Sequence, residues 1–445
     1  MSTDVKPPRV VGMAGALIVG FNGVVGSGIF ALPALLFVAA GTFSPFAILV
    51  FACLYATVIA VVAKLSTVFR QSGGHQLYAE HAFGPVVGFQ IGWFSLVASM
   101  SGAAANFHVL VSYLAAIFPV FEIPAVRLAT ILALIVFFTA ISISGTARSI
   151  KVLMLGTFLK FVPIIVLCLF GLIQNGVPSD VTLPTFSKFE SIALLLAFAF
   201  SGCDSAVLAA GEVKNPRKML FGSLFANLAL VAIFYALIQL AYVAVAPDPS
   251  AIDRPIAAMG ADLFGPSGSL AVSIAVIFSI ATLLLNVFVV VPRIAYGMAR
   301  RGVLPHIFSY VSPRFKTPAV AIAGFGTIVA ALSLSGGFTM LATLLVSIEQ
   351  LVYLTVTAAL IVMWKRREAG LRDTLGLGWA FIILAAIGYM TWLLSQLSLG
   401  DALNTGVIVL IGLVLYTLSR RAGVKQDDIE LPASQAPISS TGAAA

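Results

Sequence analysis

Charged residues are scarce in this chain of 445 residues, and their scarcity excludes a soluble globular protein. Lys, Arg, Asp and Glu together make up 9% of the sequence, whereas hydrophobic residues make up 60% and the mean hydropathy is +1.08. Soluble domains carry about 25% charged residues. We therefore interpret the chain as an integral membrane protein.

Cysteine and histidine are also few, with three and four copies respectively. Cys53, Cys168 and Cys203 show no CxxC spacing, which argues against a disulfide framework and against a zinc site. The sequence lacks the Gly-x-Ser-x-Gly motif of hydrolases and the His-Glu-x-x-His motif of metalloproteases. We expect no enzyme, and neither a metal nor a cofactor.

Long apolar runs are abundant instead. A helix needs about 20 apolar residues to cross a bilayer. Twelve runs of suitable length occur, at residues 12–38, 45–68, 86–117, 128–146, 152–173, 190–210, 220–246, 267–298, 318–335, 340–364, 377–397 and 402–419. The stretches between them are too short for a soluble domain, so we expect the function to lie within the membrane.

The basic residues are unevenly distributed between the two sides of the membrane. If the amino terminus is cytoplasmic, all but four of the 25 Lys and Arg residues are cytoplasmic, the exceptions being Arg127, Lys188 and Arg254 outside and Lys160 within the membrane. Basic residues concentrate in cytoplasmic loops, so both termini are expected inside. The net charge of +8 is then explained by basic residues that contact anionic lipid at the inner surface, and it does not indicate nucleic-acid binding.

Two apolar runs are interrupted at the depth of the bilayer core. The first contains Gly26-Ser27-Gly28, and the sixth contains Ser201-Gly202 followed by Asp204. A broken helix survives at this depth only where it is buried in protein or lines a cavity. Glycines that merely let helices pack closely are one explanation. Two polar interruptions in matching positions favour an inverted-repeat transporter with a site at the midplane.

Four stretches carry the most specific motifs. They read GSGIFALPA from Gly26, SGGHQLYAEHAFGPVVGFQIGW from Ser72, FAFSGCDSAVLAAGEVKNPRK from Phe198 and RIAYGMARRGVLPHIFSYVSPRFKTP from Arg293. With these motifs the chain resembles, over nearly all of residues 10–365, the amino acid–polyamine–organocation (APC) superfamily of permeases. The resemblance is to the basic amino acid/polyamine antiporters or the general amino acid permeases.

The resemblance implies an all-α integral membrane fold of twelve transmembrane helices, similar to the bacterial leucine transporter, with discontinuous first and sixth helices. Residues 10–173 would form the first inverted repeat (helices 1–5) and residues 190–365 the second (helices 6–10). Residues 377–420 would add helices 11 and 12. Residues 1–9 would be a cytoplasmic amino terminus and residues 421–445 a disordered cytoplasmic tail.

An unwound turn at the first break suits an amino acid substrate. N–H groups at the start of one half-helix favour a carboxylate, and carbonyls at the end of the other favour an ammonium. The resemblance implies that the Ser27 hydroxyl and the Gly28 N–H contact the carboxylate. It also implies that the carbonyls of Val24 and Ser201 contact the amine. Gly26 permits a close backbone approach.

Further residues near the breaks are candidates for gating and selectivity. The resemblance gives Phe198, four residues before Gly202, the position of an aromatic gate, although simple packing is the alternative for one of 33 phenylalanines. Glu349 and Gln350 depart from the apolar or small residues that we expect in the tenth run. Glu349 is expected either to shape selectivity or to pair with another helix. Asn106 is expected to form a hydrogen bond between helices.

Lys160 and Asp204 are the candidates for ion coupling. Inserting a lysine at the centre of a membrane helix costs roughly 2.5–3.5 kcal/mol, so we expect Lys160 to be functional or paired. The resemblance implies that it replaces a sodium ion, with Ser279 and Thr282 as guesses for its neighbours; snorkelling to the surface is the alternative. Asp204 stands where the family usually carries glutamate, which suggests proton sensing or stabilisation of the break.

Together these features predict a secondary active transporter. It would move amino acids across a bacterial plasma or inner membrane by alternating access, through proton-coupled symport or exchange. A permease or antiporter for polyamines or other organic amines is the alternative. Its expected partners are the small-molecule substrate, protons and the lipid bilayer, with the chain acting as a monomer or homodimer.

Overall fold

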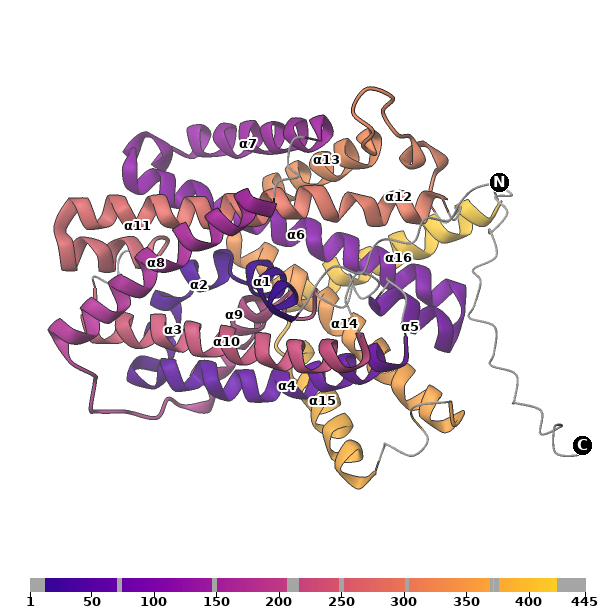
Figure 1. Cartoon of the computed structure of the whole chain (residues 1–445), viewed down its shortest axis with the longest axis horizontal. Helices are drawn as coiled ribbons and strands as arrows, with labels where there is room; N and C mark the ends of the chain where they lie inside the picture. The colour runs from indigo at the N-terminus through magenta and orange to yellow at the C-terminus, as the bar shows by residue number, and fades with distance from the viewer. Residues whose placement is uncertain are drawn as a thin grey trace, which may run out of the picture.

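The computed structural model describes residues 13–69, 74–145, 150–205, 216–247, 252–300, 304–368, 371 and 376–421. Throughout this part the regular structure is helical, which confirms the all-α prediction (Figure 1). Eight helical stretches there are long and apolar enough to cross a membrane, and three further apolar helices are shorter. The proposed amino-terminal segment 1–9 and nearly all of the proposed tail lie outside the described residues.

The helices follow the apolar runs of the sequence. Their bounds are α1 Met13–Val24, α2 Ser27–Ala31, α3 Pro33–Ala40, α4 Ser44–Val68, α5 Gly74–Phe83, α6 Pro85–Ile117, α7 Pro124–Ser144, α8 Ile150–Asn175, α9 Phe186–Phe200, α10 Pro216–Val245, α11 Pro255–Val290, α12 Pro292–Arg300, α13 Ala319–Ser335, α14 Phe338–Lys365, α15 Leu377–Ser395 and α16 Leu399–Arg421. Many begin with proline, whose missing N–H costs nothing in the first turn of a helix.

The bundle surrounds a few short helical segments. Figure 1 shows α1, α2 and α9 near the middle, with α4 and α10 on one side and α6 and α11 on the other. Helix α4 packs along α10, and α6 packs against both α11 and α14. In the most apolar stretch of α6, 83% of the residues are buried, whereas the corresponding fraction for α16 is 17%. Helix α6 therefore belongs to the core. The exposed apolar side chains of α16 suit contact with lipid.

Both expected helix breaks are present. Helix α1 ends at Val24 and α2 begins at Ser27, with Gly26 extended between them (φ −130°, ψ −144°). Leu32 keeps helical dihedral angles, so α2 and α3 together form one half-helix. The second break follows α9, which ends at Phe200, and Gly202 there adopts a positive φ of 87°.

Two stretches that were expected to be loops are partly helical. Helix α11 begins at Pro255, not near residue 267, and it continues past a kink at Gly265 (φ 65°, ψ −158°) just before Pro266. The glycine allows the chain to bend, so the proline does not end the helical stretch. Between α4 and α6, α5 forms a short helix that packs against α6 and α14.

Candidate substrate site at two helix breaks

The two helix breaks lie against each other. A Cβ atom added to Gly202 would lie 3.1 Å from the carbonyl oxygen of Gly23, and one added to Gly28 would lie 2.8 Å from Cα of Ala199. Backbone therefore meets backbone across the gap between the two halves of the chain. The sequence predicted both breaks, and the structure brings them together.

Glycine at the first break is required by protein packing. A Cβ atom on Gly26 would lie 2.8 Å from Leu283 Cδ1 on α11 and 3.0 Å from Asn106 Oδ1 on α6. Ala199 similarly occupies the space beside Gly28. Protein atoms therefore fill the space beside both glycines, and the glycines by themselves do not indicate room for a substrate. A ligand-binding role depends on the polar groups beside them.

Those polar groups are partly satisfied from α6. The Ser27 N–H donates to Asn106 Oδ1 at 3.0 Å, and Asn106 Nδ2 donates to the Gly102 carbonyl at 2.7 Å. The hydrogen bond between helices expected of Asn106 is thus confirmed. The Ser27 hydroxyl is buried and has no hydrogen-bond partner among the described residues. Buried polar groups are nearly always paired, so this orphan hydroxyl is a candidate ligand contact.

The carbonyl predicted to bind the amine is already in use. Tyr235 on α10 donates its hydroxyl to the Val24 carbonyl at 3.2 Å, and Val24 itself is buried. A carbonyl oxygen has two lone pairs, so one remains for a second donor. Tyr235 thus supplies a hydrogen bond to a carbonyl at the end of α1, where carbonyls lack partners within the helix.

The second break carries a carboxylate from another helix. Ser201 Oγ donates to Glu349 Oε2 of α14 at 2.6 Å. Ser201, Gly202 and Glu349 all remain partly accessible in the middle of the bundle, so this break is not fully packed. Glu349 therefore pairs with another helix at the candidate site itself. Gln350, the next residue on α14, is 1% exposed, and its Oε1 has no partner in the described part.

Asp204 lies beyond the break and contacts α5. Its Oδ2 is 2.8 Å from His75 Nε2, with side chains only 7% and 12% exposed. The His75 ring also lies 5.7 Å from the ring of Tyr353, whose hydroxyl meets that of Tyr55 at 2.9 Å. Sequence reasoning assigned His75 no role. The one signal available in the sequence was its imidazole, which can pair with a carboxylate.

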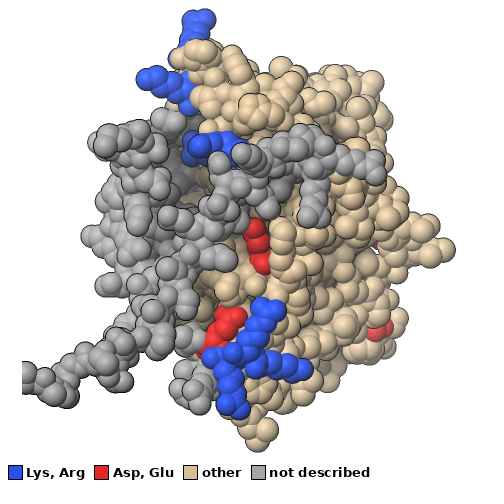
Figure 2. Space-filling view, turned by 90° about the vertical axis from the view of Figure 1, so that its right-hand side faces the viewer, with Lys and Arg blue, Asp and Glu red and all other residues tan. Residues whose placement is uncertain are grey.

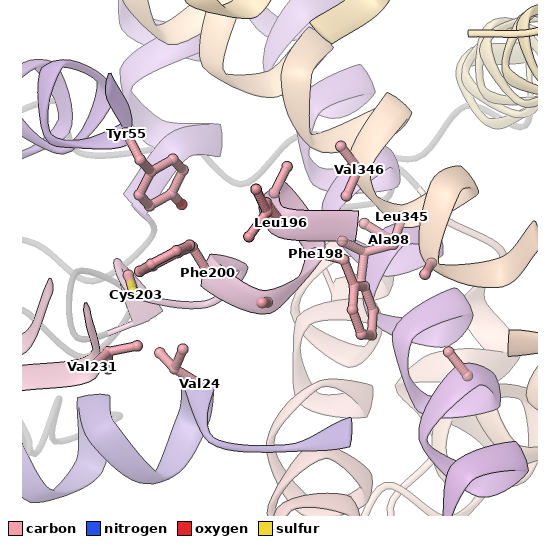
Figure 3. Close-up of a cluster of buried hydrophobic side chains, with 14 of the residues drawn as sticks. Val24, Tyr55, Ala98, Leu196, Phe198, Phe200, Cys203, Val231, Leu345 and Val346 are labelled. Carbon is pink, nitrogen blue, oxygen red and sulfur yellow. The ribbon is translucent and has the colours of Figure 1, made fainter. Parts of the chain in front are cut away.

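Phe198 and Phe200 leave α9 in opposite directions (Figure 3). Phe200 packs with Tyr55, at 6.0 Å between ring centroids. Phe198 meets Phe338, at the start of α14, edge to face at 5.4 Å. Phe198 thus sits beside the second break but is held against another aromatic ring, an arrangement that both a gate and simple packing would produce.

Lys160 belongs to α8, and its side chain lies outside the described residues. Of its two expected neighbours, Ser279 is fully buried with an unpartnered hydroxyl, whereas Thr282 donates its hydroxyl to the Phe278 carbonyl of its own helix at 2.7 Å. Across the described ranges, no group of three or more His, Cys, Asp or Glu side chains is arranged to hold a metal ion.

The chain is similar to known transporters along most of its length. Residues 11–415 match the family model described as amino acid permease. The serine/threonine exchanger SteT of Bacillus subtilis is 25% identical, over 93% of this chain and 97% of that protein. The branched-chain amino acid permease BcaP of the same organism is 26% identical, over 93% of each chain. The low-affinity putrescine importer PlaP of Escherichia coli is 27% identical, over 82% and 83%.

The family match covers far more than half of the chain, and the relatives are permeases, not enzymes. A helical bundle with two breaks at its centre agrees with that assignment. The chain belongs to the amino acid permease family, within the APC superfamily.

Proposed function

We propose that the protein moves amino acids across the cytoplasmic membrane by alternating access, as a proton-coupled symporter or an exchanger. The observation that carries the proposal is the backbone contact between the two helix breaks near Gly23, Gly28 and Gly202. Broken helices at the interface of two repeats are the usual place for a transporter's substrate. Two relatives are named as an exchanger and a permease of amino acids, which agrees with this substrate class.

In this proposal the first break holds the amino acid backbone. The Ser27 hydroxyl and the N–H of Gly28, in the first turn of α2 where no intrahelical acceptor exists, bind the carboxylate. The remaining lone pair of the Val24 carbonyl and the carbonyl of Ser201 bind the ammonium. Gly26 and Gly202 give the breaks their shape, and Phe198 closes the site from outside.

Glu349 supports a second candidate, transport of an organic amine such as a polyamine. Its carboxyl group lies beside Ser201, so an amine group at the second break would meet an acidic partner whose ionised form it stabilises. A relative is named as a putrescine importer. Glu349, with Gln350 beside it on α14, is our proposed determinant of substrate choice between these two classes.

Asp204 and Lys160 are the proposed coupling residues. Asp204 connects the second break to α5 through His75, so a change in its charge would alter a contact between two moving parts. Lys160 is proposed to take the place of a sodium ion. Replacing it with alanine should leave substrate binding but stop uptake driven by a pH gradient. Uptake that follows external sodium and ignores a pH gradient would contradict this role.

The proposed topology has twelve membrane helices, in two inverted repeats (10–173 and 190–365) followed by residues 377–420. Both termini are placed in the cytoplasm. Figure 2 shows Lys and Arg side chains on the face of the molecule that carries α5 and the end of α12, and basic residues favour the cytoplasmic side. This orientation puts the start of α7 and the start of α14 outside.

A competition screen in proteoliposomes tests the function. Proteoliposomes that contain the purified protein would be loaded with one unlabelled amino acid at a time. Exchange against external labelled amino acids and labelled putrescine would then be measured. Saturable, stereospecific exchange of at least one amino acid is expected. Flux that does not saturate would indicate a channel, and transport of putrescine alone would establish the amine alternative.

A further inference from the structure

A separate cavity lies on the proposed outer side of the aromatic pair formed by Phe198 and Phe338. Its volume is about 360 Å³, within the range of small-molecule sites. The wall comes from α2, α3, α6, α7, the segment before α11 and the start of α14. Its polar and aromatic members include His108, Ser112, Arg127, Asp253, Phe338 and Thr339.

Arg127 is held in the wall with most of its donors available. Its Nη2 donates to Ser112 Oγ at 2.6 Å and to the His108 carbonyl at 3.3 Å. A guanidinium has five N–H donors, so the others remain for a ligand. No described carboxylate forms an ion pair with Arg127, whereas Arg254, a nearby arginine of the outer side, pairs with Glu122 at 3.0 Å. A half-buried arginine without a counter-ion calls for an anion.

Asp253 supplies the opposite charge in the same wall. It is exposed, and within the described ranges it forms no ion pair with Arg127 or with any other basic side chain. One cavity therefore presents a cation and an anion that do not neutralise each other directly. A free α-amino acid carries the complementary pair, a carboxylate and an ammonium on one carbon.

The cavity also adjoins the candidate substrate site through one aromatic contact. Phe338 lines it and meets Phe198, which stands three residues before Ser201 in the chain. The ring pair therefore connects the cavity wall to the helix that leads into the second break. With Phe198 as the proposed gate, a molecule bound in this cavity would lie next to the ring pair. The rings would have to move before the molecule could reach Ser201 and Glu349.

We infer that this cavity is a second, outer binding site for an α-amino acid, with Arg127 on the carboxylate and Asp253 on the ammonium. The inference depends on the proposed function for the direction of transport. It adds a site that is occupied before the central one. A putrescine molecule, which has no carboxylate, would gain nothing from Arg127.

The test compares variants of full-length protein in proteoliposomes, with a radiolabelled mixture of the protein amino acids as probe. R127Q should raise the KM for external amino acids about tenfold or more, the effect of one lost charged hydrogen bond. The KM for efflux from inside should stay unchanged. R127K should recover part of the loss, because it keeps the charge but not the fork. The control R254Q removes the same charge from the outer side without touching the cavity.

Other outcomes would overturn the inference. Equal changes in both KM values would indicate a structural role for Arg127, and equal effects of R127Q and R254Q would indicate general surface charge. No change in R127Q would leave the cavity without a role in binding. D253N should raise the same external KM, and its failure to do so would remove the ammonium contact.

Equilibrium dialysis of the same probe separates this inference from the proposed function. If the wild type transports no amino acid, the proposed function fails. The outer site then stands only if wild type and R254Q bind amino acids and R127Q binds them at least about tenfold more weakly. If the wild type transports amino acids and R127Q neither binds nor transports them differently, the outer site is wrong and the proposed function survives.

Discussion

The two helix breaks meet at the centre of the bundle, but they are held in different ways. At the first break, the Ser27 hydroxyl is buried without a partner among the residues described, and glycines allow α2 to pack closely. At the second break, Ser201 is bonded to Glu349 of α14, and Asp204 contacts His75 of α5. The backbone of the first break is also bonded to α6 and α10, but its Ser27 hydroxyl stays available to a ligand. At the second break, the side chains of Ser201 and Asp204 are both engaged with other helices.

This difference suggests a division of roles. Free polar groups at a fixed backbone break suit recognition, because a ligand can replace the partner that they lack. Side chains that bridge separate helices suit coupling, because their bonds change when the helices move. Four variants test the division, and their expected effects run from loss of transport to a modest change in its rate.

Gly28→Val should abolish transport and lower the melting temperature. The added side chain would push against Ala199, whose Cα lies 2.8 Å from the position of a new Cβ, so the two breaks must separate. Transport assays and thermal unfolding in detergent would measure both effects. Gly406→Val on α16 is the control, since a Cβ there meets nothing within 4 Å. Wild-type transport in Gly28→Val would show that contact between the breaks is unnecessary.

Glu349→Gln should change the order of substrates. The variant keeps a hydrogen-bond acceptor for Ser201 but removes the negative charge, so relative uptake of amines against neutral amino acids should fall about tenfold. A competition series with putrescine and neutral amino acids would measure this ratio. Glu190→Gln, at the other end of α9, is the matched control. An unchanged ratio in Glu349→Gln would make its bond to Ser201 purely structural.

Ser27→Ala should raise the KM for amino acids about tenfold with little change in stability. Its hydroxyl has no hydrogen-bond partner among the described residues, so its removal should weaken ligand binding without weakening the fold. Ser101→Ala should do the reverse, because the Ser101 hydroxyl donates to the Leu341 carbonyl at 2.7 Å. Initial-rate kinetics and thermal unfolding separate the two. A large loss of stability in Ser27→Ala would contradict its free role at the first break.

His75→Gln should slow transport about threefold, because an amide replaces the imidazole that lies 2.8 Å from Asp204. The contact joins α5 to the second break, so weakening it should disturb the movement of α5 relative to that break. Asp204→Asn should have a similar effect. His81→Gln removes the other histidine–acid pair of α5, which is more exposed and should contribute little. Equal transport rates in His75→Gln and wild type would contradict a coupling role for the contact between His75 and Asp204.

Much of the fold was predictable because membrane helices obey local rules. A backbone in lipid must satisfy its own hydrogen bonds, so apolar runs become helices and polar interruptions such as Gly26-Ser27-Gly28 become breaks. Helix ends were less predictable. The apolar run at 267–298 predicted a helix that begins there, but α11 begins at Pro255 and continues past the bend at Gly265. The twelve-helix count and the repeat symmetry stay predictions.

The sequence by itself indicated a helical membrane protein with breaks near residues 26 and 202, because composition and apolar runs are properties of neighbouring residues. That the protein is a permease followed from the resemblance of its motifs to a known family. Only the tertiary structure decided that Glu349 meets Ser201, that Asp204 meets His75 and that Arg127 lines a cavity. A polar side chain in an apolar bundle must find a partner, but which one depends on how distant helices pack. Ser201 and Glu349 lie 148 residues apart, and no local pattern encodes their meeting.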